Sequence, residues 1–129
     1  MGFRIPNPRT ALAVADAEMD WTMRIAAVLA FIVMAAHCAA VMAFVAPRFG
    51  SLDFLRLHYT ATRGVDWIDS WQMIFVFPVA GMLTFFANLV IAVRAARMSR
   101  QLGALVLGVT VLVEVFLAVG GILAVLLNG

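Results

Sequence analysis

Three long apolar windows constrain this chain more than any other feature of its sequence. They cover residues 25–46, 73–93 and 102–127. Each reaches the ~20 residues that an α-helix needs to cross about 30 Å of hydrocarbon. Because backbone N–H and C=O groups inside lipid must be hydrogen-bonded within their own segment, such windows are expected to be helical. The sequence therefore predicts an all-α fold, an integral membrane three-helix bundle in a single domain.

Composition excludes a soluble fold. Of the 129 residues, 65% are hydrophobic and 12% are charged, whereas a soluble domain has about 45–50% and about 25%. A chain of this length has too much surface to hide that excess. The first window also exceeds the ~7–15 apolar residues of a cleavable signal peptide, so we expect it to remain as a span.

The arginines predict the direction of the chain. The loop at 94–101 contains three arginines and no acidic residue, whereas the loop at 47–72 balances its three arginines with aspartates. Since basic loops stay on the cytoplasmic side, we expect a cytoplasmic N-terminus, a periplasmic or extracellular C-terminus and a bacterial inner membrane. Residues 1–24 form a cytoplasmic tail in this prediction, with a possible interfacial helix from Ala11 to Asp20.

Five polar residues fall inside the predicted spans. They are His37, Thr84, Asn88, Thr110 and Glu114. An ionisable group inside a span costs about 2.5–3.5 kcal/mol on insertion scales, so His37 and Glu114 need an explanation. Counted from their cytoplasmic ends, both lie roughly 18–20 Å deep.

Small and polar residues recur every three or four positions in each window, which places them on one helix face. We expect these faces to pack together, because small residues let membrane helices approach closely. Three interpretations of His37 and Glu114 remain open: a hydrogen-bonded lock, proton or ion translocation, and contact with a helix of another protein. Pro78 is expected to kink the second span.

The external loop at 47–72 combines aromatic residues with charge, which suggests partial order at the membrane surface. A short helix is expected around Ser51 to Leu57, and Gly64 could supply a turn with positive φ. The candidate contact residues are His58, Tyr59, Gly64, Asp66, Trp67, Asp69 and Trp71. As an alternative, His58, Asp66 and Asp69 could form a metal or acid-base cluster, although local pairing with arginines is the ordinary role of such residues.

The stretch from Leu57 to Trp71, followed by Pro78, resembles a His-aromatic-Asn…Gly-x-x-Asp…Trp loop of small bacterial multi-span membrane proteins. It is also similar to the N-terminal domain of the toxin-immunity and signal-transduction membrane family of the sporulation-delaying type. The matching residues are His58, Tyr59, Gly64, Asp66, Trp71 and Pro78, whereas Thr60 replaces the usual Asn. The resemblance covers about residues 57–92 and implies a multi-span inner-membrane protein without a catalytic activity.

No catalytic triad, phosphate-binding glycine loop or zinc-protease motif occurs in the sequence. The scattered arginines argue against nucleic-acid binding, and Cys38 alone cannot form an internal disulfide. We therefore expect no cofactor, no metal and no enzymatic activity. The predicted function is an accessory or interaction subunit of a larger membrane complex, or a self-associating bundle. The alternatives are a transport or sensing module that uses His37 and Glu114 as a protonation site, and a toxin-immunity protein.

Overall fold

The computed structural model describes residues 20–51, 53–60 and 62–129. The expected tail at 1–24, with its interfacial helix, therefore lies almost entirely outside the described residues. The described elements follow the order α2 (Trp21–Val45), the 3-10 helix η1 (Ala46–Arg48), β1 (Phe54–Thr60), β2 (Gly64–Ser70), the 3-10 helix η2 (Trp71–Phe75), α3 (Val76–Ala96) and α4 (Arg100–Leu126).

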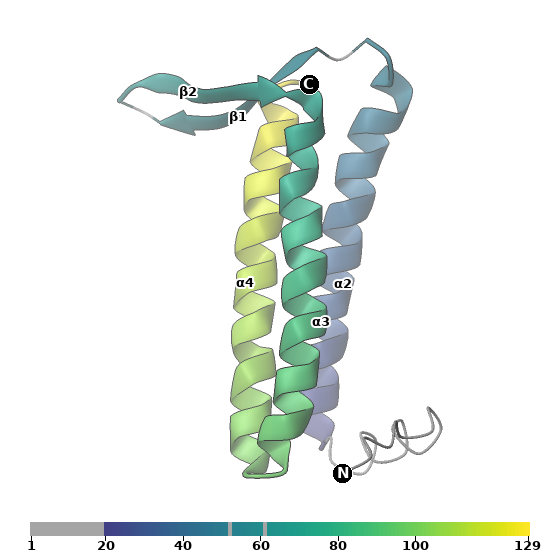
Figure 1. Cartoon of the computed structure of the whole chain (residues 1–129), viewed down its shortest axis with the longest axis vertical. Coiled ribbons are helices and arrows are strands. Elements are labelled where there is room, and N and C mark those ends of the chain that lie inside the picture. Colours follow the sequence, from purple (N-terminus) through teal and green to yellow (C-terminus); the bar gives the residue numbers. More distant parts are fainter. Residues whose placement is uncertain (1–19, 52, 61) are drawn as a thin grey trace, which may run out of the picture.

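Three long helices stand side by side and form the bundle (Figure 1). Each is long and apolar enough to cross a membrane, so the predicted all-α three-helix membrane fold is confirmed. Helices α2 and α4 run in the same direction and α3 runs opposite to them. Helix α4 packs along both neighbours, whereas α2 and α3 contact each other less. We call the end that carries β1 and β2 the hairpin end, and the end where residues 97–99 join α3 to α4 the short-loop end.

The faces that pack together are those with the small and polar residues. On α4 the buried residues recur every three or four positions, as one face of a helix requires. They are Gly103, Leu107, Thr110, Glu114, Gly121 and Ala124. The remaining helix surface is apolar and open: only 22–33% of each hydropathic window is buried inside the protein, which leaves the rest for lipid.

Helix α2 begins at a side-chain cap. The Asp20 carboxylate accepts a hydrogen bond from the Met23 backbone N–H at 2.9 Å and one from the Thr22 hydroxyl at 2.7 Å. Such a cap satisfies a backbone donor that has no partner within the helix. At its other end, Arg48 donates a hydrogen bond to the Phe44 carbonyl at 3.0 Å and lies 4.4 Å from the centre of the Phe44 ring.

Pro78 lies in the first turn of α3, directly after the 3-10 helix η2. The N–H groups of a first turn have no partner within an α-helix, so a proline there leaves no helical hydrogen bond unmade. Pro78 thus lies close to the junction between η2 and α3, and the kink stays a prediction.

The predicted short helix at Ser51 to Leu57 is wrong. The segment enters the antiparallel hairpin of β1 and β2, in which Phe54 pairs with Ser70 and Thr60 with Gly64. Its side chains alternate as a half-buried strand requires: Leu55 and Leu57 are buried, while Phe54 and Arg56 are exposed. The positive φ expected at Gly64 is confirmed, with a value of 74°.

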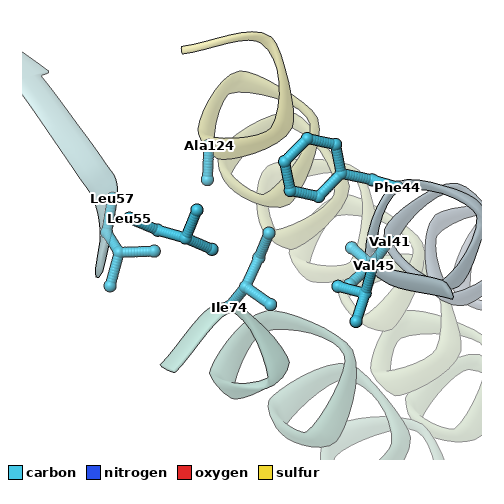
Figure 2. Packing of buried hydrophobic residues seen from close by; sticks show 7 residues of the cluster. All are labelled: Val41, Phe44, Val45, Leu55, Leu57, Ile74 and Ala124. Atoms are coloured by element: carbon cyan, nitrogen blue, oxygen red, sulfur yellow. The ribbon is translucent and has the colours of Figure 1, made fainter. Parts of the chain in front are cut away.

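The hairpin is fixed to the bundle by a hydrophobic cluster. Figure 2 shows Leu55 and Leu57 directed from β1 toward Ile74 and toward the ends of α2 and α4. The remaining members of this cluster are Val41, Phe44, Val45 and Ala124. An isolated two-stranded hairpin is marginal in water, so these contacts are what order it. Beyond them, the far end of the hairpin projects sideways past α4 (Figure 1).

Acid should weaken the cap of α2. The hydrogen bond from Met23, the hydrogen bond from Thr22 and the positive charge of Arg100 lower the pKa of the Asp20 carboxyl below its usual range. A lowered folded-state pKa adds stability above the unfolded-state value of about 3.9, and this is lost as pH falls through the folded-state pKa. We expect Asp20→Asn, which keeps a capping side chain, to reduce the acid-induced fall in melting temperature measured by circular dichroism in detergent.

Asp20→Ala serves as the comparison, because it removes both the cap and the charge and should lower the melting temperature at neutral pH as well. An unchanged acid dependence in Asp20→Asn would show that this carboxylate contributes nothing to stability.

Candidate functional site

His37 lies inside the bundle on α2, with 1% of its surface exposed. Its ring packs against the backbone of α4 at Gly121, where an added Cβ would collide with Nε2, Cδ2 and Cε1. Among the described residues, neither ring nitrogen has a hydrogen-bond partner. The imidazole therefore occupies a space that exists because residue 121 is glycine.

Glu114 on α4 occupies a similar space against α3. Its side chain is fully buried and lies against α3, where a Cβ added to Gly81 would be 2.8 Å from Oε2. Within the described part of the chain, both carboxyl oxygens lack a hydrogen-bond partner. A second buried ionisable group thus fits against a glycine of a neighbouring helix.

The expected hydrogen-bonded lock between His37 and Glu114 is absent from the described residues. On α4, Gly121 lies about two helical turns, roughly 10 Å, beyond Glu114. His37 thus contacts α4 at Gly121, whereas Glu114 contacts α3 at Gly81.

The other three polar residues in the spans differ in their environment. Thr110 is buried, and its hydroxyl donates a hydrogen bond to the Val106 carbonyl of the preceding turn at 2.8 Å. Thr84 and Asn88 are half-buried on α3. Thr110 is thus satisfied within its own helix, and in the described part of the chain the buried side-chain atoms without a partner are those of His37 and Glu114.

Unsatisfied buried groups are expensive. Each costs about 1–3 kcal/mol, and more when it carries charge. Native proteins keep few of them, and a functional role or a bound water or ion is a common reason. His37 and Glu114 are therefore the strongest intramembrane candidates for a role in binding or proton exchange.

A hollow of about 180 Å³ lies beneath the hairpin end, between α2 and α3. It is lined by Cys38, Met42, Phe75, Pro78, Val79 and Met82. Pro78 thus forms part of the wall of this hollow. Its lining is apolar, so it suits a hydrocarbon chain or an apolar side chain.

The structure distributes the predicted loop residues over the hairpin and η2. His58 and Tyr59 lie on β1, Gly64, Asp66, Trp67 and Asp69 lie on β2, and Trp71 begins η2. The Trp71 ring packs 5.6 Å from Phe49 and 6.2 Å from Phe75, so this residue stabilises the base of the hairpin. Asp69 accepts a hydrogen bond from the Ser70 N–H at 2.7 Å. In the described part of the chain, no group of three or more metal-ligating side chains comes together.

Asn128 is a residue that the sequence reasoning missed. Its side-chain oxygen accepts a hydrogen bond from the Arg56 N–H at 2.9 Å, and its amide donates to the carbonyls of Arg56 and Ala124, both at 2.7 Å. The amide thus pairs with the free edge of β1 like a residue of a neighbouring strand. No local pattern signals this role, because the two positions are far apart in sequence.

One face of the hairpin presents exposed side chains beside Asn128. Phe54 and Ile68 are 74% and 61% exposed, and the exposed Arg56 neighbours both, since it is two residues from Phe54 on β1 and pairs with Ile68 across the strands. We call these three residues the hairpin patch. They line a hollow of about 410 Å³ together with Leu55, Leu127, Asn128 and Gly129.

Comparisons with protein-family models, curated proteins and solved structures find no match to this chain.

Replacing His37 and Glu114 by apolar residues should not destabilise the bundle. Because neither group has a hydrogen-bond partner among the described residues, we expect Glu114→Met and His37→Leu each to leave the melting temperature in detergent unchanged or to raise it. The two effects should add to within about 0.5 kcal/mol, since side chains without a shared contact rarely couple. Measured unfolding free energies of both single variants and the double variant provide this test.

A coupling above about 1 kcal/mol would mean that the two side chains interact directly, against the geometry described above.

Proposed function

We propose that this protein is a non-catalytic accessory or interaction subunit that works through contacts with other membrane proteins, either a larger complex or further copies of itself. The hairpin patch is the observation that carries this proposal. We place the protein in a bacterial inner membrane with its N-terminus in the cytoplasm, because of its arginine distribution. In this orientation the hairpin lies on the outer side.

The composition of the hairpin patch is typical of binding surfaces. Aromatic residues and arginine are enriched in the centres of protein interfaces, where they supply most of the binding energy. In the described part of the chain, the Arg56 side chain has no acidic partner, and its backbone is already satisfied by Asn128. A partner segment with an apolar side chain beside a carboxylate would complement this surface.

The position of the patch also favours a docking role. Leu55 and Leu57 anchor the inner face of β1 in the bundle core, which holds Phe54 and Arg56 on the opposite face. Preorganised side chains lose less conformational entropy on binding. The resemblance of residues 57–92 to toxin-immunity proteins offers one form of this role, in which the outer surface intercepts a toxin.

The first experiment is extraction of the tagged chain from native membranes in mild detergent, followed by sizing and mass spectrometry of copurifying proteins. We expect a stoichiometric partner or a defined homo-oligomer, and at least a tenfold weaker association for the Phe54→Ala, Arg56→Ala variant, as expected from ~1.4 kcal/mol lost at an interface anchor.

Phe116→Ala is the matched control. Phe116 is 76% exposed, almost the same as Phe54, but lies on the lipid-facing side of α4. This control should keep its partner. Recovery of a monomer alone would reject the accessory role, and equal losses in both variants would reject the hairpin patch as the contact.

A second candidate function is supported by the unsatisfied atoms of His37 and Glu114. In this candidate the two groups form an intramembrane protonation site of a transport or sensing module. Buried acids and histidines inside spans are common elements of proton pathways. Because neither group has a hydrogen-bond partner in the described part of the chain, transfer from one to the other would need intervening water.

Reconstitution into liposomes that contain a pH-sensitive dye tests the second candidate. The wild-type chain should relax an imposed pH gradient faster than empty liposomes, because Glu114 can exchange a proton. Glu114→Gln should remove this activity, whereas Phe116→Ala should retain it. If wild-type and empty liposomes behave alike, this chain does not conduct protons by itself.

A further inference from the structure

A third hollow, of about 330 Å³, lies on α3 near the short-loop end of the bundle. It is lined by Leu89, Val90, Val93, Arg94 and Arg97, positions whose spacing places them along one side of the helix. Val90 is 54% exposed and both arginines are exposed. The hollow therefore opens to the surroundings of the bundle.

The lining changes from apolar to cationic along the helix axis. From Leu89 to Arg97 the rise is about 12 Å, over which three aliphatic side chains give way to two guanidinium groups. This change falls at the end of a membrane-spanning helix, where lipid headgroups begin. An amphiphile with an anionic head and a hydrocarbon chain matches this gradient in both parts.

The charge balance at this end also favours an anion. Residues 94–101 include three arginines and no acidic residue. Arg100 interacts with the Asp20 carboxylate, whose pKa it lowers. Within the described chain no acidic residue pairs with Arg94. An arginine fork can hold a phosphate through two parallel hydrogen bonds, a geometry that lysine does not provide.

We propose that an anionic phospholipid binds in this hollow, with its phosphate at Arg94 and Arg97 and one acyl chain along Leu89, Val90 and Val93. The site is separate from the hairpin patch, which lies at the other end of the bundle. Its occupant would fix the depth of α3 in the bilayer through a specific contact, in addition to the general attraction between basic loops and anionic membranes.

The test is native mass spectrometry of the full chain in detergent, titrated with phosphatidylglycerol and, in parallel, with phosphatidylcholine of the same chain length. We expect one phosphatidylglycerol per chain to bind with at least tenfold preference. The Arg94→Gln, Arg97→Gln variant should bind it roughly 10- to 30-fold more weakly, as expected for the loss of two arginines that face anionic lipid.

Two further variants separate this site from general charge attraction. Arg56→Gln, which removes an arginine at the hairpin end, should leave the affinity unchanged. The Arg94→Lys, Arg97→Lys variant keeps the net charge and the expected orientation in the membrane. It should still bind phosphatidylglycerol several-fold more weakly, because the arginine forks are lost. Circular dichroism of every variant confirms that the helices are intact.

Equal binding of both lipids would overturn the proposal, as would equal losses in the Arg56 and Arg94, Arg97 variants. Inorganic phosphate is the last comparison. If millimolar phosphate displaces the lipid completely, the site recognises a free phosphate group and not a phospholipid.

Discussion

The close approach of α4 to both of its neighbours is the contact on which the rest of the structure depends. A Cβ added to Gly103 would lie 2.9 Å from the Ala92 carbonyl of α3 and 2.8 Å from the Met23 side chain of α2. Inside lipid, the helices gain little from hydrophobic association, so such backbone contacts must supply the attraction through van der Waals packing. Toward the hairpin end, Gly120 plays the same part beneath the Phe77 ring.

Two other glycines make room for the buried polar groups. Gly81 and Gly121 leave room for Glu114 and His37, which enter the bundle from different helices and face different neighbours. An apolar side chain could fill either space and would leave no polar atom there without a hydrogen bond. The choice of a carboxyl and an imidazole therefore sacrifices stability, which is typical of functional positions. His37 and Glu114 are therefore candidates for a function inside the bundle. The hairpin patch nevertheless gives the stronger argument, which is for the proposed accessory role.

The two ends of the bundle have different chemistry. At the hairpin end, hydrophobic contacts and Asn128 hold an ordered hairpin that projects beyond the helices (Figure 1). At the short-loop end, the connection is brief and rich in arginine. A partner protein at the first end and an anionic lipid at the second would together set the position of the chain in a membrane complex, since the two surfaces share no residue.

The sequence by itself determined the helical fold, because windows of this length and hydropathy have no other way to satisfy their backbone in lipid. It also identified the small-residue faces and the glycine turn at residue 64, since helical periodicity and positive φ are local properties. Only the tertiary structure decided the rest. The segment that contains Leu55 and Leu57 forms a strand because the bundle offers a hydrophobic surface to these two side chains. Strand preference depends on such surroundings. His37 and Glu114 pack against different helices and make no hydrogen bond in the described part of the chain, and Asn128 bonds to a segment far away in sequence. A sequence pattern encodes neither of these arrangements.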